Sequence, residues 1–475
     1  MIRATGRGAD PDAARRALAD AAPAVFWLDR PDAPEPTPPL TGAVEADLVI
    51  VGAGYTGLWA ARHALADDPG RDVVVLDAGT AAVGASGRNG GFLSASITHG
   101  AANGRTHFPD ELATLVRLGN ENYDALVADL GTLGIDAAFE PVGEIDVAVA
   151  PWQADELPEY ADLLRELGED VELLDADAVR AQVASPAFLG GVWTRSHVGL
   201  VDPARLAWGL LAAVQRAGTR VHEHTAVTAV EDDGDTVVLR GLHLHLRARR
   251  VLLATNAFPG LVAPIRRAVV PVYDHVLVTE PLSDEQWAAV GWRGRQGLSD
   301  GGNQFHYFRP TPDGRILWGG WDALYHYGNR VGPELEQDAR TSRTLAEHFL
   351  ATFPQLEGIR FTHRWGGPIA TTSRFMFTAG TRHAGKVAWS VGYTGLGVGA
   401  SRFGARVALD LLAGADTERT RLAAVRKPPF PFPPEPLRWT AVQTTRRAIA
   451  RADAHDGRRG PWLRLLDRFG IGFDS

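Results

Sequence analysis

Apolar runs, a glycine turn and a helical pattern follow one another within residues 48–79 of the chain. The apolar run Leu48–Val51 leads into the hexapeptide GAGYTG at residues 52–57, and apolar positions then recur at helical spacing. A second apolar run, Val73–Leu76, ends on Asp77. This order predicts a strand, a tight turn, a helix and a second strand with an acidic residue at its tip.

The glycines of this turn have the spacing that a dinucleotide phosphate requires. Gly52 permits the tight turn, Gly54 lets a pyrophosphate approach the backbone, and Gly57 lets the helix pack against the strand. The helix N-terminus then holds the phosphate, and Asp77 accepts hydrogen bonds from a ribose. The alternative is a glycine-rich turn in another kind of α/β unit. We predict a dinucleotide site formed by Gly52, Ala53, Gly54, Tyr55, Thr56, Gly57, Asp77 and Ala78.

A second glycine-rich stretch, VGASGRNGGF, covers residues 83–92. Its small residues leave the backbone free to bend, and Ser86, Arg88 and Asn89 supply polar groups between them. This combination suits a loop that wraps a phosphate or a planar polar ring. A flexible loop without a ligand explains the same residues equally well.

Helical and strand-like patterns alternate through the middle of the chain. We expect helices over residues 109–133, 154–167 and 203–216, the last of them with Asp202 as its N-cap. His243 and His245 share one strand face, where a solvated surface is favoured over a metal pair because no third ligand is near. No metal site is predicted. The expected strands lie within residues 139–150, 221–230, 237–239, 242–246, 249–254 and 271–280.

Aromatic residues are concentrated between residues 300 and 330, around a turn at residues 311–314 (TPDG). The turn predicts a hairpin of residues 304–310 and 315–320. Alternation places Phe305, Tyr307 and Arg309 on one face of the first strand. Gln304, His306 and Phe308 occupy the other face. One face is expected in the core and the other beside a ligand, and the pattern leaves open which is which.

A second strand–glycine loop–helix unit lies near the end of the chain. The strand 386–391 runs into GYTGLGVG at residues 392–399, and an apolar helix is expected over residues 407–412. A nicotinamide enzyme needs no such second unit, whereas FAD has a pyrophosphate and an electron-rich ring edge to hold. The two units therefore favour FAD over a nicotinamide cofactor.

Composition and charge narrow the function classes. The formal net charge of −9 argues against a nucleic-acid partner. The absence of cysteine excludes disulfides, thiolate metal sites and cysteine nucleophiles. The N-terminal residues lack the apolar core of a secretion signal, and no run is long enough to span a membrane, so we expect a cytoplasmic protein.

The two ends of the chain differ in character from the middle. Residues 1–45 are proline-rich and predict an extended arm, which Phe26 and Trp27 could pin to the body; a disordered tail is the alternative for residues 1–20. Residues 427–435 predict a stiff linker. The amphipathic stretch 462–469 is expected to pack on the body, with a membrane or a partner as the alternative.

These motifs together resemble the D-amino-acid-oxidase-like flavoenzymes. GAGYTGLWAA with LDAG, GASGRNGGF, GLVDPARL, VLLATNA, FRPTPDGRILWGG, RWGGP and GYTGLGVGASRFGA follow the order of that family. The WLD…PP…PL lead-in, the ASGRNGG loop and the C-terminal tail look most like the gamma-glutamylputrescine oxidase-like branch. The resemblance implies an α/β (mixed α+β) fold, with a Rossmann-like parallel-sheet FAD domain and a substrate domain built on a large mixed or antiparallel sheet.

The resemblance also implies a discontinuous division of the chain. The FAD-binding domain comprises residues 46–105, 200–262 and 366–416, and the substrate-binding domain comprises residues 106–199 and 263–365. An N-terminal arm (1–45) and a C-terminal linker and tail (417–475) flank them. Position by position, the residues carried over to the cofactor are those of the first turn together with Ser86, Arg88, Asn89, Gly90, Gly91, Val227, Gly395, Leu396, Gly397 and Val398.

Three departures from the family bear on substrate and cofactor. No histidine stands near Arg88, so the FAD is expected to be non-covalent. Gly399 replaces the lysine of N-methyl amino-acid oxidases, and Ile369 or its neighbours replace the carboxylate-binding arginine of glycine-oxidase-like relatives. These losses favour an amine whose carboxylate, if it has one, is far from the reacting carbon, such as a polyamine-like or gamma-glutamyl amine.

The expected enzyme is an FAD-dependent amine or amino-acid oxidoreductase. A neutral amine gives hydride from its α-carbon to the flavin, and the imine is hydrolysed, while oxygen or another acceptor reoxidises the cofactor. An aromatic pocket lowers the amine pKa and attracts the cation on entry. The alternatives are an amino-acid dehydrogenase that passes electrons to a quinone or carrier, and a non-catalytic flavin-binding protein. The pocket candidates are Tyr307, Arg309, Trp365 and Tyr393, with His306 as a proton acceptor.

Overall fold

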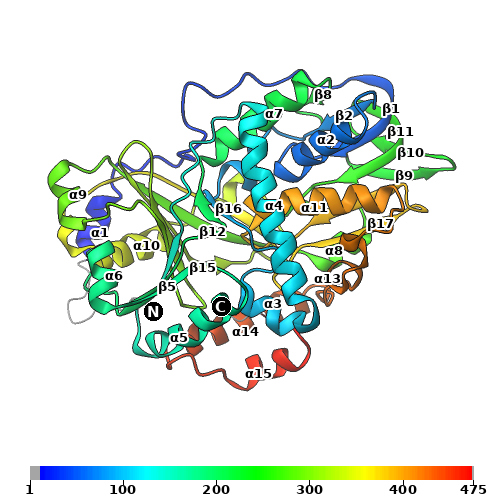
Figure 1. The fold of residues 1–475 in the computed structure, drawn as a ribbon. Helices are drawn as coiled ribbons and strands as arrows, with labels where there is room; N and C mark the ends of the chain where they lie inside the picture. The colour runs from blue at the N-terminus through cyan, green and yellow to red at the C-terminus, as the bar shows by residue number, and fades with distance from the viewer. Residues whose placement is uncertain (1–10, 473–475) are drawn as a thin grey trace.

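Two eight-stranded sheets, each covered by helices, make up the computed structural model, which describes residues 11–472 (Figure 1). The first sheet has the order β17-β18-β11-β1-β2-β8, with β10 and β9 added beside β11. Its strands are β1 (Gly42–Val51), β2 (Val73–Leu76), β8 (Arg220–His222), β9 (Ala229–Asp233), β10 (Thr236–Arg240), β11 (Leu244–Leu253), β17 (Thr378–Arg382) and β18 (Val387–Val391).

The centre of the first sheet is parallel, as expected for a dinucleotide fold. Strand β1 pairs in parallel with β11 on one side and with β2 on the other, and its last residues are fully buried. Four helices pack on one face of this sheet (Figure 1). They are α2 (Tyr55–Asp67), α4 (Leu112–Leu133), α7 (Pro203–Arg216) and α11 (Gly397–Leu412).

Several sequence-based boundaries need correction here. The stretches 242–246 and 249–254, expected as two strands, form the single strand β11. Its first half alternates between buried and exposed, whereas its second half is buried on both faces, which explains the change of pattern. Conversely, residues 221–230 divide into β8, which pairs in parallel with β2, and β9, which pairs with β10. Helix α11 begins at Gly397, ten residues before the apolar stretch that predicted it.

The second sheet has the order β16-β12-β15-β14-β13-β4-β6-β5 and is mostly antiparallel. The predicted hairpin is confirmed as β14 and β15. The boundary predicted at residue 366 falls inside β16, so the domain division stays a prediction. The strands are β4 (Glu144–Ala148), β5 (Val171–Asp175), β6 (Gly190–Thr194), β12 (Val270–Thr279), β13 (Gly297–Asp300), β14 (His306–Pro310), β15 (Ile316–Leu324) and β16 (Phe361–Thr371). The remaining strands, β3 (Phe92–Ser94) and β7 (Val198–Leu200), pair with each other.

Helices assigned to different parts of the sequence meet across these layers. Although α4 falls in the segment predicted for the substrate domain, Tyr123, Leu126 and Leu130 pack in the same core as Leu58 of α2. Asp202 caps α7 as predicted, accepting from the Arg205 backbone N–H at 3.0 Å. The other helices before the tail are α1 (Pro11–Ala17), α3 (Ala101–His107), α5 (Pro151–Glu166), α6 (Ala176–Gln182), α8 (Ala263–Ala268), α9 (Asp284–Val290) and α10 (Ala339–Thr352).

The N-terminal arm is an ordered strap between the layers. Residues 11–17 form α1, which packs against α10, so disorder is wrong for that part; residues 1–10 lie outside the described chain. Trp27 is buried, as expected, and its Nε1 donates to the Asn89 carbonyl at 3.0 Å. Farther along, the Thr37 hydroxyl donates to Glu223 at 3.0 Å. The arm therefore contacts both sheets' layers along its length.

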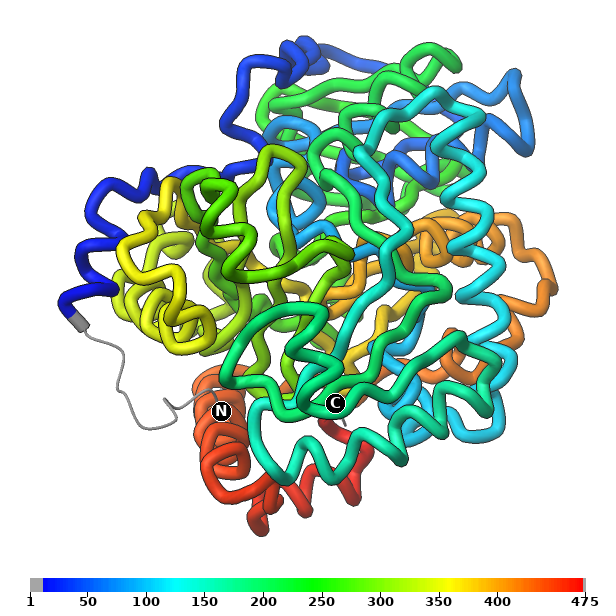
Figure 2. Tube along the Cα trace, turned by 60° about the vertical axis from the view of Figure 1, so that its left-hand side comes forward, coloured from blue at the N-terminus to red at the C-terminus, as the bar shows by residue number. Residues whose placement is uncertain are grey.

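The C-terminal residues return to the body of the molecule (Figure 2). After α12 (Glu418–Arg421) and α13 (Ala423–Arg426), the proline-rich linker leads to α14 (Leu437–Asp453) and α15 (Pro461–Arg468). Leu463 of α15 is buried, and Trp462 Nε1 donates to Thr445 Oγ1 of α14 at 2.9 Å. The prediction that residues 462–469 pack on the protein's own body is confirmed. Among residues 11–472, no helix combines the length and apolar character that a membrane crossing needs.

Candidate functional site

A large cavity lies where the two sheets' layers meet. Its volume is about 2200 Å³, more than twice the upper end of ordinary ligand pockets, which reach about 1,000 Å³. The first glycine turn, the 84–90 loop, the second glycine loop, one face of the second sheet and the C-terminal tail all line it. There is therefore room for a dinucleotide and a substrate side by side.

The first glycine turn has no space for side chains. Gly52 has φ +113°, and a Cβ there would lie 2.5 Å from the Ala254 carbonyl oxygen. A Cβ on Gly54 would lie 2.9 Å from Ser86 Oγ, and one on Gly57 would lie 1.8 Å from the Gly52 oxygen. Gly52 and Gly54 face the cavity, with Tyr55 and Thr56, whereas Gly57 and Ala53 do not line it. The predicted roles of turn, close approach and helix packing match this geometry.

The helix ends at the two glycine units are suited to negative charge. Neither Gly54, before α2, nor Leu396, before α11, caps its helix with a side chain. At α2 the first N–H, that of Tyr55, donates to Ser86 Oγ at 2.9 Å, so an anion there would meet the N–H groups that follow it; the start of α11 has no side-chain cap. Gly395, with φ +94°, turns the chain before α11. Gly395, Leu396, Gly397 and Val398 all line the cavity, and their contact with the cofactor stays a prediction.

Asp77 lines the cavity and also stabilises the first turn. Its Oδ2 accepts from the Ala53 N–H at 2.7 Å and its Oδ1 accepts from the Gly79 N–H at 2.8 Å. Burial raises the pKa of Asp77, and these two hydrogen bonds oppose that effect. Ala78 and Val227 lie at the same end of the cavity. The ribose contact at Asp77 stays a prediction, and the two hydrogen bonds give the residue a structural role that sequence alone did not indicate.

The 84–90 loop is held by its own polar side chains. Asn89 Nδ2 donates to the carbonyls of Ala85 and Ser86 at 3.0 and 2.9 Å, and Asn89 Oδ1 accepts from the Gly91 N–H at 2.8 Å. Ser86 Oγ accepts from the Tyr55 N–H at 2.9 Å. These bonds favour a shaped binding loop over a flexible one. Ser86, Arg88, Asn89 and Gly90 line the cavity, while Gly91 packs behind it.

Arg88 is the basic residue of this loop, and its charge is already matched. Its Nε donates to the Val83 carbonyl at 2.6 Å, and its Nη1 forms an ion pair with Glu336 at 2.6 Å. The side chain is 13% exposed. An arginine tied in this way holds the loop and offers little net positive charge to a substrate carboxylate.

Three of the five candidate catalytic residues line the cavity: Tyr307, Trp365 and Tyr393. Tyr307 donates to Asp274 Oδ2 at 2.6 Å, and Trp365 Nε1 donates to the Arg88 carbonyl at 3.0 Å. The Tyr393 hydroxyl lies 3.0 Å from Thr56 Oγ1 and 2.8 Å from Ser390 Oγ. Burial raises the pKa of Tyr393 to about 12, so it stays protonated.

The other two candidates need correction, because neither lines the cavity. His306 points to the opposite sheet face, where its Nδ1 lies 2.7 Å from Asp300 Oδ2 and its Nε2 lies 2.9 Å from His348. Its ring stacks on Trp318, so it is a structural histidine and not a proton acceptor for substrate. Arg309 is fully buried behind the 84–91 loop and donates to the Val201 and Gly91 carbonyls at 2.7 and 3.2 Å.

A row of acidic side chains on the second sheet was missed by the sequence reasoning. In the strand register, Ser299 of β13 lies opposite Tyr307 of β14 on one side and Asp146 of β4 on the other. All three residues line the cavity. Ser299 Oγ lies 2.8 Å from Glu144 Oε1 and 2.7 Å from Asp146 Oδ1. Glu144 and Asp146, two residues apart on one strand, share a face; that spacing was the available signal.

The contact geometry implies a shared proton in this group. A hydroxyl carries one hydrogen, so Ser299 can donate to one carboxyl group and must accept from the other or face its lone pairs. Burial raises the pKa of both Glu144 and Asp146, and the charge of Asp146 adds to the shift at Glu144.

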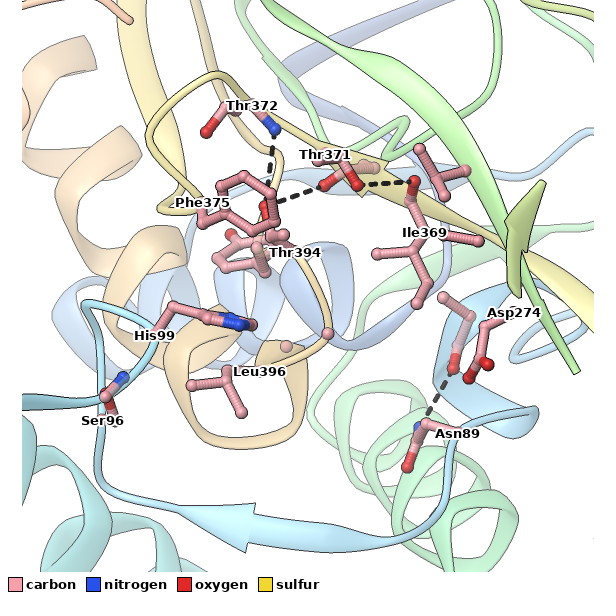
Figure 3. A pocket seen from close by; sticks show the side chains of 18 of the residues that line it. Asn89, Ser96, His99, Asp274, Ile369, Thr371, Thr372, Phe375, Thr394 and Leu396 are labelled. Carbon is pink, nitrogen blue, oxygen red and sulfur yellow. Dashed lines mark hydrogen bonds between the residues drawn. The ribbon is translucent and has the colours of Figure 1, made fainter. Parts of the chain in front are cut away.

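His99 and Phe375 form another wall that sequence reasoning missed (Figure 3). Their backbones, together with Thr394, have φ values of 60°, 57° and 49°, a region that residues other than glycine rarely adopt. Their rings lie 5.7 Å apart. Burial lowers the pKa of His99 to about 4, so it is neutral and does not repel a cation. Backbone handedness of this kind leaves no mark in the sequence pattern.

Comparison with known proteins decides which cofactor these turns hold. The family model described as "DAO: FAD dependent oxidoreductase" matches residues 47–411. The chain belongs to this family. It is 32% identical over 398 residues to the gamma-glutamylputrescine oxidoreductase of Escherichia coli strain K12, covering 83% of this chain and 89% of that one. The protein is thus an FAD-dependent oxidoreductase acting on amines or amino acids.

Solved structures show the same fold. Glycine oxidase from Geobacillus kaustophilus superposes with a TM-score of 0.67 at 22% identity, over 79% of this chain and 96% of that one. L-proline dehydrogenase from P. horikoshii superposes with a TM-score of 0.64 at 17% identity, over 79% of this chain and 96% of that one. The predicted fold class, with its parallel-sheet FAD layer and second mixed sheet, is confirmed.

The residues present fit FAD. Glycines whose Cβ atoms would clash stand where a pyrophosphate must approach, and the uncapped start of α11 lines the same cavity. Bound there, the cofactor would be held by Gly52, Gly54 and the 84–90 loop at one side and by residues 395–398 at the other. A lysine at position 399 has no room, because a Cβ on Gly399 would lie 2.2 Å from the Ser94 carbonyl oxygen.

Proposed function

We propose that the protein oxidises an amine that has no carboxylate beside the reacting carbon, such as a diamine, a polyamine or a gamma-glutamyl amine. The observation that carries this proposal is the charge of the cavity. Asp274, Asp146 and Glu144 line it from the second sheet, and Arg88 is paired with Glu336. In their ionised form these carboxyl groups attract ammonium groups, and the paired Arg88 is a weak bidentate partner for an α-carboxylate.

The substrate preference of one relative supports the proposal. The Escherichia coli relative is named for gamma-glutamylputrescine, in which the putrescine amino group is far from the glutamyl carboxylate. Ile369 lines the cavity, and the resemblance implies that it or a neighbour stands where glycine-oxidase-like relatives carry their arginine. Both features favour recognition of a cation.

The chain's own residues bind and orient the amine. FAD, when bound, supplies the hydride acceptor for the amine α-carbon. Asp274, whose Oδ2 accepts from Tyr307, supplies a negative charge for the ammonium group in the cavity wall. Tyr307, Trp365 and Phe305 exclude water and lower the cost of presenting the neutral amine. Deprotonation on entry is the one acid–base step that this chemistry needs.

Product analysis tests the proposal. Purified enzyme is incubated aerobically with putrescine, longer polyamines, gamma-glutamylputrescine, glycine, sarcosine and D-alanine, and aldehyde, ammonia and hydrogen peroxide are measured. We expect aldehyde and ammonia from the first three, with peroxide if oxygen is the acceptor. Aldehyde without peroxide, dependent on an added quinone, would identify a dehydrogenase. Turnover of the three α-amino acids alone would refute the proposed substrate class.

A further inference from the structure

The C-terminal tail forms part of the cavity wall. The family match ends at residue 411, and the segment beyond it turns back to the body of the molecule (Figures 1 and 2). Residues of α14 and α15 line the cavity. The wall that the tail contributes includes Thr445, Ile449, Trp462, Leu466 and Ile471. Two arginines of the tail, Arg446 and Arg459, also line the cavity and are paired with Asp322 and Asp467. The tail thus closes the site with residues that lie outside the shared family core.

One end of this segment is fixed to the second sheet. Asp453, at the end of α14, is buried, and its carboxylate accepts from Asn303 Nδ2 at 2.6 Å and from the Gln304 N–H at 3.0 Å. Arg446 forms an ion pair with Asp322 at 3.2 Å. These partners belong to the loop and strand that flank Tyr307. The position of α14 relative to the cavity is therefore set by buried polar contacts.

The other end of the segment is fixed across the cavity. The Gly472 N–H donates to the Ser373 carbonyl at 3.0 Å, and the Gly472 carbonyl lies 3.1 Å from His107 Nε2 of α3. Trp462 joins α15 to α14 through its bond to Thr445. The tail consequently spans from the second sheet to α3 and the 373 loop, and bridges the cavity between them.

Opposite the tail, α5 supplies the facing wall. A Cβ on Gly457 would lie 3.0 Å from the Trp152 ring, so tail and α5 touch at this edge. Tyr160 of α5 also lines the cavity, and burial first, then the charges of Asp146 and Glu144, raise its pKa well above the ordinary value. The space between α5 and the tail thus leads from the apolar side chains of the tail toward Glu144 and Asp146 on the second sheet. An alkyl chain ending in an ammonium group matches that sequence of surfaces.

We propose that α14 and α15 form the outer wall of the substrate channel and set the chain length of the amine that the enzyme accepts. Trp462 and Leu466 are the specificity-determining residues. That the channel holds a cationic amine rests on the proposed function. That α14 and α15 form its outer wall rests on the contacts of the tail. Apolar burial tightens binding by about fourfold for each added methylene group until a chain meets a fixed wall.

The test is a chain-length series measured as binding. Dissociation constants of linear α,ω-diamines, from diaminopropane to diaminodecane, are determined by anaerobic calorimetry on the FAD-loaded enzyme. For the wild type we expect affinity to rise by about fourfold per methylene to an optimum and then to fall. Trp462→Ala and Leu466→Ala are expected to move the optimum to longer diamines. Trp462→Phe, which keeps most of the bulk, leaves it in place.

Matched controls come from the same two helices. Trp439 and Leu465 are 39% and 43% exposed and do not line the cavity, so Trp439→Ala and Leu465→Ala should keep the wild-type optimum. An unchanged optimum in Trp462→Ala and Leu466→Ala, or an equal shift in the controls, overturns the inference. If diamines bind with the expected shift but never reduce the flavin, α14 and α15 do limit chain length and the proposed reaction is wrong. If no diamine binds, both are wrong.

Discussion

The hydroxyl of Tyr307 donates to Asp274 Oδ2 across 2.6 Å within the wall of the cavity. Burial raises the pKa of Asp274 to about 6, and the bond from Tyr307 opposes that shift. The pKa of Tyr307 is raised well above its ordinary value, by burial first and by Asp274 next. The proton therefore stays on the tyrosine, and above pH 6 the negative charge stays on Asp274, where an ammonium group can meet it.

Amine affinity should depend on pH through Asp274. Its folded pKa of about 6 means that the carboxylate is ionised above that pH and neutral below it, so affinity should fall as the pH drops through about 6. Asp274→Asn should no longer show this fall in affinity at low pH. It should also bind diamine about tenfold or more weakly, which corresponds to the free energy of a hydrogen bond to a charged group. Dissociation constants measured across pH check this, with Asp284→Asn on exposed α9 as control. An identical acid limb in Asp274→Asn would contradict the assignment.

Glu144 should make the protein less stable as the pH rises. Burial raises its folded pKa above the ordinary value of 4.5, so the folded state holds more protons than the unfolded state above that pH. The free energy of unfolding then decreases with rising pH from the ordinary carboxyl range upward. Glu144→Gln, which imitates the protonated form, should flatten this dependence in thermal unfolding measured from mildly acidic to mildly alkaline pH. Equal slopes in wild type and Glu144→Gln, with Glu285→Gln as surface control, would show that the group has no such shift.

Gly54→Ala should weaken FAD binding. The new Cβ would lie 2.9 Å from Ser86 Oγ, on the surface that the pyrophosphate must approach. Overpacking of this kind costs about 1–3 kcal/mol, which corresponds to at least a fivefold loss of affinity. The flavin-to-protein absorbance ratio after dialysis measures it. Gly70→Ala, in a surface turn where a Cβ would meet Asp68 at 3.5 Å, serves as control and should keep full occupancy.

The flavin should leave the protein on denaturation. The chain has no cysteine, and the 84–91 loop contains no histidine to which the ring could be tethered. After unfolding in acid or urea and ultrafiltration, all yellow colour should pass into the filtrate as free FAD. Colour that stays with the denatured protein would reveal a covalent link, and peptide mapping would then locate it.

The parts that sequence predicted well are those where sterics leave little choice. Gly52 and Gly57 can only be glycine in their surroundings, and Asp202 caps its helix through a contact three residues away. Such local requirements leave a direct trace in the sequence. The FAD layer, the β14–β15 hairpin and the cofactor loops followed from them.

The parts that failed depend on distant neighbours. Alternation correctly placed His306 and Arg309 on opposite faces of the strand, but which face meets the cavity depends on the segments that pack against the sheet. Arg309 lies on the cavity-side face, yet residues Gly91 and Val201 cover it. The role of Ser299 between two carboxyl groups arises from strand pairing across more than 150 residues. The packing of Trp462 against α14 and the cavity is likewise a tertiary contact.

The central claim is that two helix starts hold FAD above a cavity built for a cation. Anaerobic titration of the purified, FAD-loaded enzyme with putrescine and longer diamines, followed by flavin absorbance, tests it most directly. The account predicts bleaching of the oxidised flavin bands by these amines and weak response to glycine, sarcosine and D-alanine. Strong bleaching by those three amino acids, with none by any diamine, would contradict it.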